Sequence, residues 1–218
     1  MSDHVSHLNQ PSRCRSSVVF RATAYIFIMA ATSTSVATQT LADQNVAAAL
    51  ETRAISAALE YVELHRESTT AFLANIAAIV SPSGKERKRA EAVAARMRNI
   101  GLASVFVDET PNAIGVIPGY SGLALVFIST LDDLATVADY QRTAKTSPHV
   151  KGDRLIGPGT NTSSSTASIL AAAEALVASG FTPEHDLVFA AVAQEETGLI
   201  GMKVVYEAFK DRAVGFVD

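Results

Sequence analysis

The clearest indication of the fold comes from the segment Asp186-Leu-Val-Phe-Ala-Ala-Val-Ala-Gln194-Glu195-Glu196-Thr197-Gly198. Residues 186–193 form a mostly apolar run, which is typical of a β-strand buried on both faces of a sheet. Two adjacent carboxylates, Glu195 and Glu196, follow this strand. Such a pair costs free energy unless a cation or hydrogen bonds compensate it, so it is the first candidate for a functional site. The spacing alone is weakly specific, because exposed loops often carry acidic pairs.

Helical and strand patterns alternate on both sides of this stretch. Apolar residues at helical spacing predict helices over residues 47–64, 69–79, 84–100, 165–179 and 202–209. Short apolar runs predict strands over 103–107, 113–117, 123–128 and 213–217, whereas residues 135–153 have the weakest pattern and are predicted to form a loop. The alternation predicts an α/β fold, a three-layer sandwich of helices around a mixed, mostly parallel sheet.

The ends of these predicted elements carry the polar residues of interest. Ser83 and Glu86 have the spacing of a capping box, so Ser83 is the predicted N-cap of a helix that ends at Gly101. In such sheets ligands bind beyond the carboxyl ends of the strands, where residues 130–133, 194–196 and Asp218 are expected to meet. The polar turn at 157–165 is expected to open a helix, whose N-terminus favours anions.

Composition excludes several classes of function. The chain has 218 residues, 48% of them hydrophobic, and a formal net charge of −4. No basic stripe is available to neutralise phosphates, so we expect no nucleic-acid partner. The single cysteine, Cys14, permits neither an intramolecular disulfide nor a thiolate metal cage.

Residues 1–42 have the three parts of a secretory signal peptide. Arginines 13, 15 and 21 are followed by a short apolar stretch at 22–31 and by small residues that offer a cleavage site after Ala37 or Ala42. The apolar stretch is shorter than the roughly 20 residues that span a bilayer. We therefore expect a secreted or periplasmic protein of residues 43–218 with no stable membrane span after cleavage. An uncleaved N-terminal anchor is the alternative.

The order of the motifs resembles the zinc metallopeptidase family of carboxypeptidase G, aminoacylase and peptidase T. The resemblance covers about residues 64–218, and the Glu-Glu-Thr-Gly segment is its most specific part. The matching motifs, in chain order, are the turn 81–84, the strand 112–115, Leu-Asp-Asp at 131–133, Gly-Pro-Gly-Thr-Asn-Thr at 157–162, Glu-Glu-Thr-Gly at 195–198 with Gly201, and Asp218.

The resemblance implies the N-terminal part of a catalytic domain that binds two zinc ions. In that family a metal-bound water attacks the peptide or N-acyl amide bond of a small peptide or acylated amino acid. Glu195 matches the general base, Glu196 a zinc ligand, and Asp218 the next zinc ligand. Asp132 matches the aspartate that orients a zinc-binding histidine. The lid and dimerisation domain of the family, and its last histidine ligand, would lie downstream of residue 218 and are expected to be absent.

Two metal-ligand positions of the family are threonine in this chain. Thr130 stands where the first histidine is expected, and Thr162 stands where an aspartate bridges the two metals. His149 and Asp133 are alternative ligands, although His149, like His185, fits a solvated histidine better. The run Ser163 to Thr166 fits a polar helix start better than a nucleophile.

The sequence therefore leaves two functions open. One is a zinc-dependent exopeptidase or amidohydrolase. The other is a catalytically inactive or truncated homologue that serves as a binding or structural module. The chain is either a fragment of a longer product or a reduced homologue, and its residues do not distinguish these origins.

Overall fold

The computed structural model describes residues 44–218. The predicted signal peptide and Cys14 lie outside these residues. The chain divides into two compact units, Met1–Glu51 and Thr52–Asp218. In the first unit, residues 44–50 are helical. The single helix predicted over 47–64 is wrong, because Thr52 adopts an extended conformation and a new helix begins after it.

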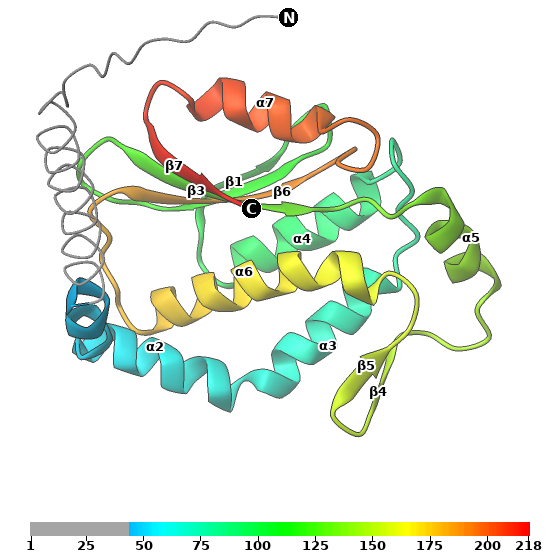
Figure 1. Cartoon of the computed structure of the whole chain (residues 1–218), viewed down its shortest axis with the longest axis horizontal. Coiled ribbons are helices and arrows are strands. Elements are labelled where there is room, and N and C mark those ends of the chain that lie inside the picture. Colours follow the sequence, from blue (N-terminus) through cyan, green and yellow to red (C-terminus); the bar gives the residue numbers. More distant parts are fainter. Residues whose placement is uncertain (1–43) are drawn as a thin grey trace, which may run out of the picture. The chain divides into compact units, whose positions relative to one another are not determined.

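The centre of the second unit is a mixed five-stranded sheet (Figure 1). Its strands, in the order β1-β2-β6-β3-β7, are β1 Ala103–Val107, β2 Ala113–Ile117, β6 Asp186–Val192, β3 Ala124–Thr130 and β7 Ala213–Val217. β3 pairs in parallel with both of its neighbours, β6 and β7. β2 pairs antiparallel with both of its neighbours, β1 and β6. The apolar runs of β3 and β6 lie at the centre, where both faces of the sheet are covered.

Helices cover both faces of this sheet (Figure 1). They are α2 Arg53–Leu64, α3 Arg66–Ala77, α4 Arg87–Asn99, α5 Ala135–Thr143, α6 Thr160–Ala178 and α7 Ile200–Phe209. α4 and α6 cover one face and α7 the other, and α2 and α3 pack against the outer side of α6. Two clusters of buried apolar side chains fill the space on the two faces. The predicted α/β three-layer sandwich is confirmed, with α2 and α3 as an additional outer layer.

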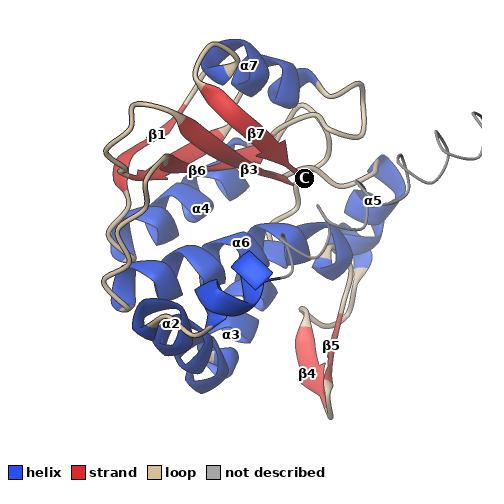
Figure 2. Ribbon diagram, turned by 60° about the vertical axis from the view of Figure 1, so that its left-hand side comes forward, coloured by secondary structure: helices blue, strands red, loops and turns tan. Residues whose placement is uncertain are grey.

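The loop predicted over 135–153 is wrong. It contains α5 and the first strand of a hairpin formed by β4 His149–Lys151 and β5 Arg154–Ile156, which stands apart from the main sheet (Figure 2). α5 buries Ala138 and directs the amide of Gln141 to the carbonyl of Ala77 at 2.9 Å. These tertiary contacts stabilise a segment whose local pattern is weak.

α6 begins earlier than predicted, at Thr160 rather than near Ser165. Gly159 precedes it with φ of 80°, and a Cβ atom there would lie 2.3 Å from the Gln141 amide nitrogen. Hydroxyl groups in the first turns donate back to carbonyls three residues earlier, as Thr160 does to Gly157 at 2.8 Å. The polar run is therefore part of the helix.

Asp186 anchors the amino end of β6. Its carboxylate accepts the N–H of Gly119 at 2.8 Å and pairs with Arg212 at 2.7 Å. Burial raises the pKa of Asp186, but these two donors outweigh burial and hold the pKa below its ordinary value. The carboxylate thus links the loop after β2 to the residue before β7.

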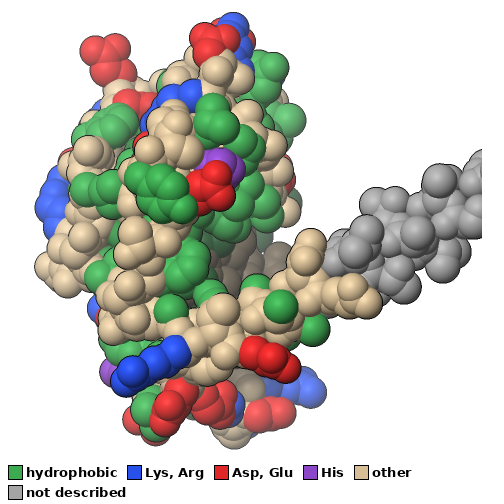
Figure 3. Space-filling model, turned by 90° about the vertical axis from the view of Figure 1, so that its left-hand side faces the viewer, with side chains coloured by type: hydrophobic (Ala, Val, Ile, Leu, Met, Phe, Trp, Pro, Cys, Tyr) green, Lys and Arg blue, Asp and Glu red, His purple; other side chains and the backbone are tan. Residues whose placement is uncertain are grey.

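The surface carries charges of both signs. On the face shown in Figure 3, acidic and basic side chains lie among hydrophobic ones. Within residues 44–218, no helix has the length and apolar character needed to cross a bilayer.

Candidate functional site

The candidate site lies where the parallel strands end. Thr130, the last residue of β3, pairs with Val192, the last residue of β6. Asp132 follows β3, the turn of Gln194 and Glu195 follows β6, and Asp218 follows β7. The topology therefore brings together the acidic residues that the sequence predicted at this edge.

Asp132 is the centre of the hydrogen-bond network. Its side chain is fully buried. One carboxylate oxygen accepts the N–H of Glu195 and the hydroxyl of Thr130, both at 2.9 Å. The other accepts the hydroxyl of Ser83 at 2.5 Å and the N–H of Glu196 at 3.2 Å. Four donors satisfy the charge, so Asp132 clamps the backbone of the turn that carries both glutamates.

Glu86 accepts hydrogen bonds from the same turn and from the turn before α4. One of its oxygens accepts the N–H of Gly84 at 2.6 Å and the N–H of Gln194 at 3.1 Å. The other oxygen is buried and has no partner among the described residues. Gln194 has φ of 56°, an uncommon conformation for a residue with a side chain, and the hydrogen bond that its N–H donates to Glu86 helps to hold it.

The predicted capping box at Ser83 and Glu86 is therefore wrong. α4 begins after Glu86 without a side-chain cap, and both side chains bind tertiary partners instead. These two residues were missed as parts of the site. Their partners lie 49 and 108 residues away in the sequence, and no local pattern reports such contacts.

Asn112 and Gly201 join the end of β6 to α7. The amide oxygen of Asn112 accepts the N–H of Ala193 at 3.0 Å, and the N–H of Gly201 donates to the carbonyl of Ala193 at 2.9 Å. A Cβ atom on Gly201 would lie 2.2 Å from that amide oxygen and 2.5 Å from that carbonyl. Only glycine permits this close approach, which explains why position 201 is a glycine.

Asp133, the alternative ligand, is fully buried and points into the fold. It pairs with Arg89 at 2.6 Å and accepts the amide of Gln141 at 3.1 Å. Arg89 also donates to the carbonyls of Leu131 and Ile79. This buried pair ties α4 to the end of β3, and removal of either partner would leave an uncompensated charge.

Glu195 lies among other acidic groups. Burial, followed by the carboxylates of Glu196, Asp132 and Asp218, raises the pKa of Glu195 above its ordinary value. Among the described residues no basic side chain forms an ion pair with any of these four groups. Within residues 44–218, no ion pair therefore offsets the negative charge of the site.

A pocket of about 290 Å³ opens beside Glu196. One wall comes from α5 and the residue before it, and the opposite wall comes from the start of α6. Its lining residues are Leu134, Val137, Tyr140, Gly157, Pro158, Gly159, Thr160, Asn161, Thr162 and Glu196. The α5 wall was not predicted, because Leu134, Val137 and Tyr140 give only a short and weak helical pattern.

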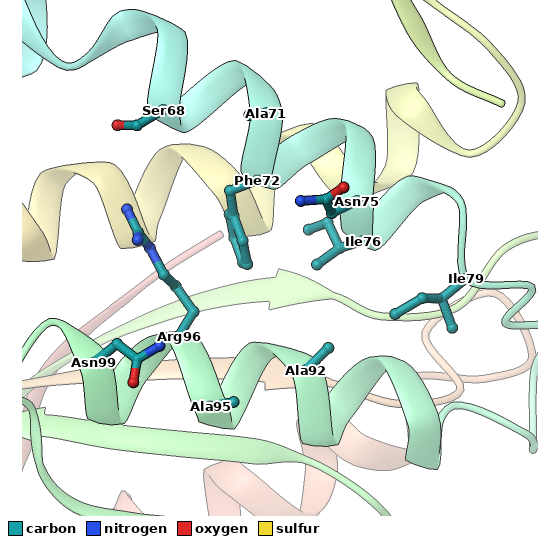
Figure 4. A pocket seen from close by; sticks show the side chains of 10 residues that line it. All are labelled: Ser68, Ala71, Phe72, Asn75, Ile76, Ile79, Ala92, Ala95, Arg96 and Asn99. Carbon is teal, nitrogen blue, oxygen red and sulfur yellow. The ribbon is translucent and has the colours of Figure 1, made fainter.

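A second cavity of about 480 Å³ lies between α3 and α4 (Figure 4). Figure 4 shows Phe72 and Ile76 of α3 pointing toward α4. Arg96 lies over the ring of Phe72 at 5.5 Å and forms an ion pair with Glu174. None of the predicted site residues lines this cavity, so the smaller pocket beside Glu196 is the better candidate for the chemistry.

The described residues do not fit the two-zinc centre that the resemblance implies. Within residues 44–218, no group of three histidine, cysteine, aspartate or glutamate side chains is placed to hold a metal ion. The hydroxyl of Thr130 is directed at Asp132. His149 is exposed in β4, and His185 lies beside Ser121 at the amino end of β6. A zinc site in proteins usually needs at least three such ligands.

Comparisons with known proteins agree with this architecture. Residues 112–217 match the model of peptidase family M28. A search of curated protein sequences found no match.

Solved peptidase structures share the fold. Dipeptidase Dug1p of Saccharomyces cerevisiae is 12% identical with a TM-score of 0.60, and human carnosine dipeptidase 1 is 16% identical with a TM-score of 0.62; each match covers 74% of this chain and 40% of the other. Aminopeptidase PepT of Bacillus cereus is 19% identical with a TM-score of 0.50, over 63% of this chain and 39% of the other. The chain thus spans about 40% of the length of these proteins. Residues 52–218 therefore share the fold of these peptidases, and the match of residues 112–217 to a peptidase family model agrees with the resemblance that the motifs indicated.

Proposed function

We propose that the chain is a peptidase-like protein that binds a peptide or an N-acyl amino acid in the pocket beside Glu196. We also propose that the described residues bind this molecule without hydrolysing it. The observation that carries the proposal is the set of hydrogen bonds that the main-chain N–H groups of Glu195 and Glu196 donate to Asp132, since the second of these glutamates lines a pocket. The match to a peptidase family supports the class of ligand.

The residues present explain why hydrolysis is not expected of them alone. The resemblance assigns Glu195 the role of general base, and its raised pKa suits that role. Attack on an amide also requires stabilisation of the negative charge that develops on the carbonyl oxygen. In the family that the motifs resemble, zinc supplies it, and the described residues do not assemble that centre.

Zinc-dependent hydrolysis by a secreted or periplasmic exopeptidase is the second candidate. The uncompensated charge of Glu195, Glu196 and Asp218 favours it, because a cation would offset the repulsion between them. Glu196 and Asp218 are the zinc ligands that the resemblance assigns. Under this candidate, further ligands come from residues outside those described here.

The two candidates are separated by one set of measurements on the purified chain. Dipeptides and N-acetylated amino acids are titrated with and without equimolar zinc, binding is followed by NMR, and amine release is followed over hours. Dialysed samples are analysed for zinc. Binding without product and with well under one zinc per chain supports the proposal.

Two results would contradict it. Product formation that requires zinc and is abolished in Glu195→Gln would establish the second candidate. Absence of binding by every dipeptide and acylated amino acid would refute the proposed ligand class. Asp139→Asn, an exposed acidic position on α5 outside the pocket lining, is the matched control.

A further inference from the structure

The cavity between α3 and α4, called the α3–α4 groove from here on, is separate from the site at the carboxyl ends of the strands. Its volume is about 480 Å³, which lies within the range of about 300–1,000 Å³ typical of small-molecule pockets. Solvent reaches the groove from both helices, because Ala71 of α3 and Ala95 of α4 are exposed. No residue lines both this groove and the pocket beside Glu196.

The two ends of the groove differ in polarity (Figure 4). Ser68, Arg96 and Asn99 lie at one end, and Ile76 and Ile79 lie toward the other. Polar groups that fix the orientation of a ligand beside an apolar wall are typical of small-molecule sites. A molecule that fits both ends therefore has a polar head and an apolar body.

Arg96 presents unused donors at the polar end. One Nη atom donates to Glu174, which is the one hydrogen-bond partner of this guanidinium among residues 44–218. This ion pair and the ring of Phe72, whose centroid lies 5.5 Å from the guanidinium carbon, hold the group in place. A guanidinium has five N–H donors, so most of them remain for an acceptor on a ligand. Asn99 adds an exposed amide at the same end.

The charges at the polar end favour a head without charge. An anionic head would approach the carboxylate of Glu174, and it would lie beside Asn99, the last residue of α4, where the helix dipole is negative. A cationic head would be repelled by Arg96. The carbonyl oxygen of an amide accepts hydrogen bonds from Arg96 without either repulsion, and its N–H group can donate to the side-chain oxygen of Asn99.

We propose that the α3–α4 groove binds a small aliphatic amide, with its carbonyl oxygen at Arg96 and its hydrocarbon body against Phe72, Ile76 and Ile79. This binding site is independent of the proposed function, since the groove and the pocket beside Glu196 have separate linings.

Four ligands test the inference by NMR titration of the purified chain: hexanamide, octanamide, octanoate and octylammonium. We expect octanamide to shift the resonances of Ala71 and Ala95 and to bind about tenfold more tightly than hexanamide, because two more methylene groups leave water. Octanoate and octylammonium should bind about tenfold more weakly than octanamide, or weaker still, because each brings a charge that the polar end repels.

Substitutions within the groove separate its two ends. Ala95→Trp fills the groove with an indole and should abolish octanamide binding. Arg96→Met keeps an apolar stem but removes the donors, so octanamide should bind about fivefold more weakly. The same change leaves Glu174 without its cation, so octylammonium should bind more tightly than it does to the unaltered chain. Asn99→Ala, at an exposed position, is the second variant of the polar end.

Ala57→Trp is the matched control, because Ala57 is exposed on α2 and does not line the groove. It should bind octanamide as the unaltered chain does, and thermal melting verifies that every variant folds. Octanoate or octylammonium binding as tightly as octanamide would overturn the uncharged head. Octanamide binding that persists in Ala95→Trp, or that is absent up to the solubility limit, would overturn the site.

Sedimentation of the unaltered chain and of Ala95→Trp tests the other occupant, a second copy of the chain. We expect the same mass for both proteins at every concentration. A dimer that Ala95→Trp dissociates would assign the groove to contact between two copies and would overturn the proposal. The peptide titrations that test the proposed function are independent of all these results.

Discussion

Replacing Asp132 with asparagine tests the clamp that holds the Glu195–Glu196 turn. The amide has the shape of the carboxylate, but only one of its two terminal atoms accepts hydrogen bonds. Each carboxylate oxygen accepts one hydroxyl and one main-chain N–H. A hydroxyl can turn round and accept from the new NH₂ group, whereas an N–H cannot. Either orientation of the amide therefore leaves the N–H of Glu195 or Glu196 facing another donor.

The expected loss in the free energy of unfolding follows from the hydrogen bonds that asparagine cannot accept. One main-chain donor loses its acceptor in a buried position, and the remaining bonds lose the strengthening that a charged acceptor provides. We expect Asp132→Asn to lower the free energy of unfolding by about 2–3 kcal/mol. Asp132→Ala removes all four acceptor contacts and should cost more. The matched control is Asp139→Asn, which breaks only an exposed ion pair with Arg142 and should stay within about 0.5 kcal/mol of the unaltered chain.

Urea unfolding measures the loss, and hydrogen exchange locates it. The amide protons of Glu195 and Glu196 should lose protection in Asp132→Asn, whereas those of the central strands should change only as far as global stability does. A loss of stability equal to that of the Asp139 control, with unchanged exchange at both glutamates, would show that Asp132 does not hold the Glu195–Glu196 turn.

Three further changes test other contacts. Asp186→Asn removes a carboxyl whose pKa the fold holds below the ordinary 3.8. The contribution of this carboxylate to stability is present above 3.8 and disappears as the pH falls through the folded pKa. The urea midpoints of the variant and the unaltered chain should therefore differ near about pH 6 and approach each other as the pH falls below 3.8. In Gly201→Ala a Cβ atom is forced to 2.2 Å from the Asn112 amide oxygen, which should cost about 2–3 kcal/mol in denaturant unfolding. Thr130→His combined with Thr162→Asp supplies an imidazole and a carboxylate, so zinc affinity measured by dialysis and metal analysis should rise about tenfold or more; unchanged zinc content would show that the two positions are misaligned.

The strands and the edge that carries the site were predictable because their signals are local. Residues 186–193 and 123–128 are apolar enough to mark buried parallel strands by themselves. The rule that parallel strands place their carboxyl ends together then brings Asp132 and Glu195 to one edge, as the structure shows. Gly101 also follows its helix with a positive φ, as predicted for a C-terminal glycine, and Gly180 follows α6 in the same way.

The missed features depend on partners far away in the sequence. Ser83 has the local pattern of a helix cap, but its hydroxyl donates to the carboxylate of Asp132, and α4 begins without a side-chain cap. α5 has weak helical periodicity, and its Gln141 is held by Ala77 and Asp133. In both places tertiary hydrogen bonds override the local preference, which one sequence does not report.

Thr130 shows why the clamp and the chemistry must be considered separately. The resemblance places a zinc-binding histidine at this position, oriented by Asp132. Here the threonine hydroxyl donates to Asp132 at 2.9 Å and so supplies the donor that the imidazole would have supplied. The hydrogen bonds of Asp132 to Thr130 and to the turn of Glu195 and Glu196 therefore form without an imidazole at position 130. It follows that the placement of Glu195 reports the fold of a peptidase and does not by itself establish catalysis, so metal content and product formation have to be measured independently of structure.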